Sequence, residues 1–69
     1  MRFDVYGLYQ LEVARVGESW RLYRLDSGKR RPVTDFAIPA AMPADEIAAY
    51  LDDMLHEIAR PGRKITTIS

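Results

Sequence analysis

One segment of the 69-residue chain has helical periodicity, so the rest of the chain must supply the layer against which this helix packs. After Pro43, apolar residues recur at the spacing of one helix face, in the order Ile47, Tyr50, Leu51, Met54, Leu55, Ile58. Proline suits a first helical turn, and the run Arg60-Pro61-Gly62 ends the pattern. The spacing predicts one amphipathic helix that buries Leu51, Met54 and Ile58 against a second layer.

Alternating residues in the first part of the chain predict that this second layer is a β-sheet. From Phe3 to Val13, apolar residues occupy the odd positions, except where Gly7 interrupts the run. A glycine there indicates either one long strand bent at Gly7 or two short strands.

Three further segments have strand character. Residues Ser19 to Leu25 and Lys29 to Ile38 follow turn sequences, although Pro32 interrupts the second segment. The β-branched residues between Arg63 and Ser69 predict a last strand after the helix. The expected fold is α+β in the order β-β-β-α-β, with a three- or four-stranded antiparallel sheet and the helix on one face. We expect a single domain over residues 1–69.

Composition limits the possible functions. The chain has no cysteine, so neither disulfides nor thiolate chemistry can contribute, and a reducing cytoplasm is the expected compartment. Its 10 basic and 10 acidic residues cancel, so no global field favours nucleic acid or a membrane. A chain this short has a marginal core, which argues against a deep cofactor pocket, and we expect no cofactor and no membrane-spanning segment.

The basic residues cluster around one predicted hairpin. Lys29, Arg30 and Arg31 follow the turn at Gly28, and Arg24 precedes it. Trp20 and Tyr23 lie on the preceding strand, and such interleaving of cations and aromatics is typical of surfaces that bind phosphates and stack bases. The bland explanation is a charged strand edge that resists aggregation, so nucleic-acid binding stays an alternative hypothesis.

The only candidate metal ligands that the sequence offers lie on the predicted helix, and the signal is weak. Asp52 and Asp53 lie four and three residues before His56, a spacing that places them on one helix face. Further ligands would have to come from elsewhere, so the plainer interpretation is a solvated face. No serine lies in a nucleophile-elbow motif, so we predict no catalytic residues and no enzyme activity.

The even positions of the first strands should be polar if that face of the sheet is exposed to solvent, yet several of them are apolar. Tyr6 and Leu8 would point away from the helix and form an exposed patch, which predicts a homodimer through the sheet. Trp20 and Tyr23 are the other expected interface residues. The alternative is that the bend at Gly7 rotates Leu8 back into the core.

Motifs spread over the chain resemble those of short uncharacterised bacterial proteins. They are Phe3-Asp4-Val5-Tyr6-Gly7, Trp20, Gly28-Lys29-Arg30-Arg31, Ile38-Pro39, Tyr50-Leu51-Asp52-Asp53 and His56-Glu57. This family is a domain of unknown function. The resemblance implies a bacterial cytoplasmic protein and transfers no site. From the residues themselves, which offer an apolar patch and no catalytic motif, we expect a non-enzymatic protein-interaction module that self-associates and has an unidentified protein partner.

Overall fold

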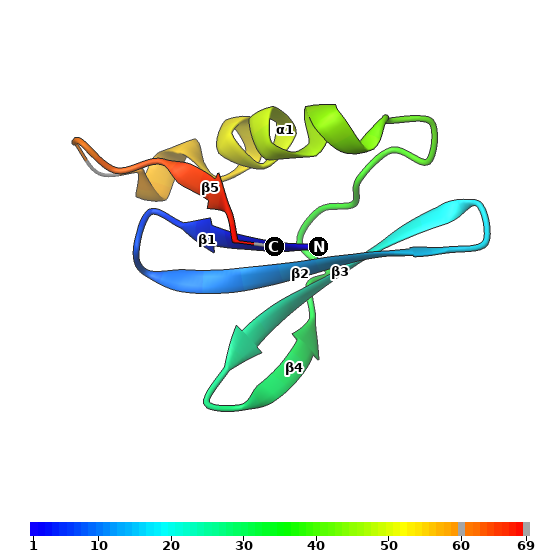
Figure 1. Ribbon diagram of the computed structural model, residues 1–69, viewed down its shortest axis with the longest axis horizontal. Coiled ribbons are helices and arrows are strands. Elements are labelled where there is room, and N and C mark those ends of the chain that lie inside the picture. The colour runs from blue at the N-terminus through cyan, green and yellow to red at the C-terminus, as the bar shows by residue number, and fades with distance from the viewer. Residues whose placement is uncertain (60, 69) are drawn as a thin grey trace.

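Five antiparallel strands and one α-helix make up the fold, in a computed structural model that describes residues 1–59 and 61–68. The elements are β1 (Arg2–Val5), β2 (Tyr9–Val16), β3 (Ser19–Asp26), β4 (Lys29–Pro32), α1 (Ile47–Met54) and β5 (Ile65–Thr67), with 3-10 turns η1 (Ala44–Glu46) and η2 (His56–Ile58). The sheet order is β4-β3-β2-β1-β5. Figure 1 shows α1 lying along one side of the sheet near β1 and β5, while the β3–β4 hairpin extends away from it. The predicted α+β class is confirmed.

The first predicted strand is two strands. Tyr6 and Gly7 have φ of 54° and 73°, and the Leu8 N–H donates to the Val5 carbonyl at 2.8 Å, which closes a tight turn. Of the two alternatives at Gly7, the pair of short strands is confirmed. Left-handed backbone at Tyr6 turns its side chain into the core, where it is 2% exposed. Its predicted place on an exposed outer face is wrong.

The third extended segment is shorter than predicted. β4 ends at Pro32, one residue before the Val33 N–H makes a last hydrogen bond to the Leu22 carbonyl of β3 at 2.9 Å, and residues 33–43 form a loop without regular structure. Side chains satisfy the carbonyls of this loop: the Tyr50 hydroxyl donates to Ala37 at 2.7 Å and Arg15 to Ala40 at 2.8 Å. The loop is thereby fastened to both the helix and the sheet.

The core lies between α1 and the inner face of the sheet. Its buried side chains are Phe3, Val5, Tyr6, Leu11, Val13, Leu22, Ile38, Ile47 and Leu51. The odd positions of β1 and β2 face inward, as the alternation predicts, and Leu51 is fully buried as the helix pattern predicts.

The helix is shorter than its apolar pattern predicts. Leu55 leaves helical geometry at φ −107° and ψ 13°, and η2 follows in place of another α-helical turn. Leu55 packs against the core, and Ile58, beyond the change of geometry, is 40% exposed. Met54, the last residue of α1, is 44% exposed because the buried face of the helix is that of Ile47 and Leu51. The predicted burial of Met54 and Ile58 is wrong. Arg60 of the predicted helix stop and Ser69 of the predicted last strand lie outside the described residues.

Candidate functional site

The aromatic residues of β3 lie on opposite faces of the sheet. Trp20 is on the helix side, where its Nε1–H donates to the Met42 carbonyl at 3.0 Å and Arg15 lies 4.7 Å from the ring centroid. Tyr23 is on the open face, with Arg30 stacked 4.3 Å from its ring centroid. Each ring already holds an arginine of this chain, so the two do not form one stacking platform.

The open face of the sheet is charged. Arg30 donates to Glu12 at 3.0 Å across the strands, which is the one ion pair among residues 1–59 and 61–68. The strand register places Arg2, Asp4 and Arg21 on the same face. An apolar patch containing Tyr6 does not exist on this face, because Tyr6 lies in the core and Leu8 lies in the β1–β2 turn.

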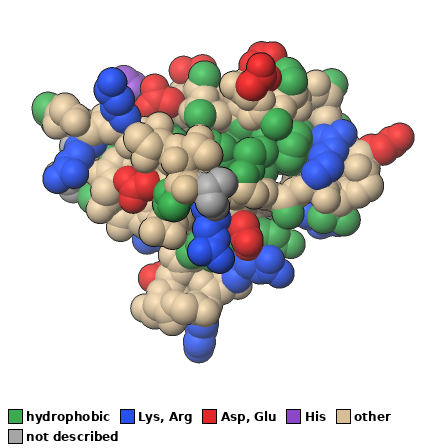
Figure 2. Space-filling model, viewed as in Figure 1, with side chains coloured by type: hydrophobic (Ala, Val, Ile, Leu, Met, Phe, Trp, Pro, Cys, Tyr) green, Lys and Arg blue, Asp and Glu red, His purple; other side chains and the backbone are tan. Residues whose placement is uncertain are grey.

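The basic hairpin is divided between the two faces of the sheet. Register pairs Arg24 with Arg31 and Asp26 with Lys29, so Arg24, Lys29 and Arg31 share the helix-side face. Arg30, which pairs with Leu25, is on the open face. Figure 2 shows Asp and Glu side chains over the helix layer at the top and a Lys or Arg side chain at the hairpin tip below.

Asp52, Asp53 and His56 do not form a cluster. His56 lies in η2, beyond the end of α1, and Asp52 instead accepts a hydrogen bond from the Tyr6 hydroxyl. In the part of the chain that the structure describes, no three His, Asp or Glu side chains come close enough to hold a metal ion.

The Tyr6–Asp52 hydrogen bond joins the β1–β2 turn to the helix. Burial, followed by the hydrogen bond and charge of Asp52, raises the pKa of Tyr6 to about 12. Tyr6 is therefore a neutral donor at ordinary pH and serves as a structural connection.

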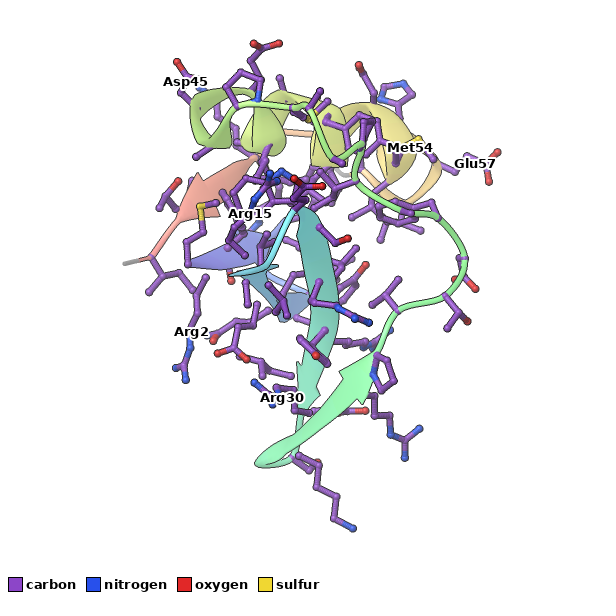
Figure 3. All side chains as sticks on the ribbon, turned by 90° about the vertical axis from the view of Figure 1, so that its right-hand side faces the viewer. Arg2, Arg15, Arg30, Asp45, Met54 and Glu57 are labelled. Carbon is purple, nitrogen blue, oxygen red and sulfur yellow. The ribbon has the colours of Figure 1, made fainter. Side chains whose placement is uncertain are left out.

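A groove opens beside Leu8, between the start of β2 and the segment that follows α1. It has a volume of about 780 Å³ and is lined by Leu8, Tyr9, Arg24, Asp35, Leu55, Glu57, Ile58, Ala59 and Pro61. We call it the Leu8 groove. Leu8 itself is 45% exposed at the β1–β2 turn, and Ile58 and Leu55 supply the other large aliphatic side chains. Figure 3 shows Glu57 projecting outward near Met54 at the end of the helical segment.

Charged groups surround this apolar lining. The Cζ atom of Arg24 lies 4.0 Å from the centroid of the Tyr9 ring, so the ring holds the guanidinium at the groove. Burial raises the pKa of Tyr9, while Arg24 acts in the opposite direction and Asp35 adds to the increase. Arg24, Asp35 and Glu57 are all exposed.

A smaller pocket adjoins the Leu8 groove. It has a volume of about 80 Å³, shares Tyr9, Arg24, Asp35 and Leu55 with the groove, and reaches Leu11, Val33 and Phe36 in the interior. An apolar side chain entering the groove would find further apolar surface there.

Sequence reasoning identified Leu8 and Arg24 but not the groove that they share. Tyr9 follows the inward alternation of the strand, and Asp35, Leu55 and Glu57 lie far from Leu8 in the chain, so no local pattern connects them. The only local signal was the adjacent apolar pair Leu8-Tyr9 directly after Gly7.

Comparison with protein families matches residues 1–69 to DUF7661, a domain of unknown function. The chain belongs to the DUF7661 family. Comparisons of this DUF7661 protein with curated proteins and with solved structures give no significant match. Among the described residues of the DUF7661 chain, no helix has the length and apolar character that crossing a membrane requires.

Proposed function

We propose that this protein is a non-enzymatic interaction module that forms a homodimer through the Leu8 groove. The observation that carries the proposal is that the groove combines an exposed apolar lining with charges of both signs on its walls. Exposed apolar surface in a groove with a charged rim is typical of a protein contact.

A two-fold symmetric contact suits this distribution of charge. In such a contact each surface patch meets its own copy, so the patch must be complementary to itself. Arg24 comes from β3 and Glu57 from η2, so a two-fold axis through the groove can pair Arg24 of each copy with Glu57 of the other. Leu8, at the protruding turn, can then enter the partner's groove and approach the adjoining small pocket.

The expected setting is a bacterial cytoplasm. The absence of cysteine is compatible with a reducing compartment, and the family resemblance is the basis for a bacterial origin.

Sedimentation over a concentration series tests the dimer. Leu8→Asp should give a folded monomer, because the new carboxylate would be desolvated and unpaired in the contact. Val16→Asp is the matched control, since Val16 is 51% exposed at the far end of β2 and should leave the dimer intact. A wild type that stays monomeric at high concentration contradicts the proposal.

Charge exchange tests the pairing itself. Arg24→Glu and Glu57→Arg should each weaken association by about tenfold or more, because each puts like charges together. The double variant restores opposite charges and should recover most of the affinity. Additive weakening in the double variant would show that Arg24 and Glu57 do not pair.

A further inference from the structure

The two edges of the sheet differ in how they are protected. The β4 edge reads Lys29-Arg30-Arg31-Pro32, and charged residues and proline on an edge strand prevent pairing with other chains. The β5 edge, Ile65–Thr67, has no charge and no proline, and the next residue, Ile68, is 48% exposed. The β5 edge is therefore protected against an added strand only by its length of three residues, whereas the β4 edge also carries charges and a proline.

The backbone of β5 is arranged to accept such a strand. The Tyr6 N–H donates to the Lys64 carbonyl at 3.2 Å, and the Ile68 N–H donates to the Arg2 carbonyl at 2.9 Å. Because hydrogen bonding alternates along an antiparallel strand, the residues that bond to β1 are Lys64, Thr66 and Ile68. The N–H and C=O groups of Ile65 and Thr67 consequently point away from β1, toward the open edge.

Space for the added strand lies between this edge and the helix. A groove of about 380 Å³ is lined by Ala48, Ala49, Asp52, Arg63, Lys64 and Ile65. The helix contributes two alanines, whose small side chains leave room above the strand edge. In Figures 1 and 3, β5 lies at the rim of the sheet beside α1. This groove shares no lining residue with the Leu8 groove.

Charge indicates the direction of the occupant. Arg63 and Lys64 immediately precede β5 and are exposed. Among the described residues neither forms an ion pair, because the one ion pair joins Arg30 to Glu12. Asp52, the acidic residue of the groove, already accepts the Tyr6 hydroxyl. An antiparallel strand added to β5 would run toward Arg63 and Lys64 and end beside them.

We propose that the β5 edge binds an extended peptide of another protein by antiparallel strand addition, with the peptide's C-terminal carboxylate at Arg63 and Lys64. The outward groups of Ile65 and Thr67 supply the main-chain hydrogen bonds. Lys64, together with Arg63 once its guanidinium turns from its place beside Gly7, selects a free carboxyl end.

The probe is a fluorescent six-residue peptide of alternating valine and threonine with a blocked N-terminus, made with either a free C-terminal carboxylate or an amide. Fluorescence anisotropy should show binding of the carboxylate form and at least about tenfold weaker binding of the amide. The double variant Arg63→Ala, Lys64→Ala should remove this difference. The matched double variant Lys29→Ala, Arg31→Ala, on the opposite edge, should keep it.

Thr67→Pro removes an outward-facing N–H and should abolish binding. NMR of the wild type tests the same point without relying on that variant's stability: the amides of Ile65 and Thr67 should shift on titration and become protected from hydrogen exchange. The proposal is overturned by equal binding of both peptides, by unshifted β5 amides, or by no binding at about 1 mM peptide. Dimerisation that Leu8→Asp leaves intact and Thr67→Pro removes would also overturn it, because a second copy would then occupy the edge.

Discussion

Leu51 and Met54 lie three residues apart on one helix, yet only Leu51 belongs to the core. Leu51 is fully buried and Met54 is 44% exposed. Leu51→Ala should lower the free energy of unfolding by about 2–5 kcal/mol, through lost burial and the cavity it leaves. Met54→Ala should cost less than about 1 kcal/mol. Chemical denaturation measures both values, and equal losses would contradict the assigned helix orientation.

Tyr6 makes a second residue-level prediction, on pH. Its pKa is about 12 in the folded protein and 10.0 for an ordinary tyrosine, so folding favours the neutral hydroxyl. Stability from this group is complete below pH 10 and falls as the pH rises from 10 toward 12, because the unfolded chain releases its proton first.

The Tyr6→Phe variant should lose most of this alkaline decrease, measured by urea denaturation across that pH range. Part of the decrease should remain, because the pKa of Tyr9 is raised as well. Tyr9→Phe is the matched control, and a Tyr6→Phe variant with an unchanged pH profile would contradict the role of the Tyr6–Asp52 hydrogen bond.

At the scale of elements, the β3–β4 hairpin tests the nucleic-acid alternative. Arg24, Lys29 and Arg31 lie on one face and Arg30 on the other, where it pairs with Glu12. We expect binding to short RNA or single-stranded DNA no tighter than about 10⁻⁴–10⁻⁶ M, with a salt slope of about −0.7 per phosphate contacted. Filter binding or anisotropy measures this. Submicromolar binding that is lost in the double variant Arg30→Ala, Arg31→Ala would make the hairpin the functional site.

At the scale of the whole molecule, charge is separated between two regions. Residues 35–59 carry acidic side chains and no lysine or arginine, while most basic residues lie in the strands. The dimer that we propose through the Leu8 groove would combine two Arg24–Glu57 pairs with apolar contact. Raising NaCl from about 50 mM to about 500 mM should therefore weaken the dimer several-fold without abolishing it, because salt screens exposed charges and leaves apolar contact in place.

A different form of association would contradict this prediction. If the basic hairpin of one copy bound the acidic helix of the next, the contact would not close on itself and species larger than a dimer would form. Light scattering at low salt distinguishes the two arrangements.

Local patterns in the sequence were sufficient for the α+β class, the single helix and the inward odd positions of β1 and β2. The periods of strand and helix are properties of neighbouring residues, so they can be recognised without the fold. The break at Gly7 was also visible, although the sequence left open whether it made a bend or a turn.

Tertiary structure alone decided which apolar residues are covered and which side chains meet. Tyr6 is buried because left-handed backbone turns it under the helix, and Ile58 is exposed because α1 ends at Met54. The Leu8 groove joins β2, β3, the loop at Asp35 and η2, which no local pattern brings together. Likewise, β5 is an edge strand because it pairs with β1, from which most of the chain separates it in sequence. Such a pairing depends on long-range packing, which no local pattern shows.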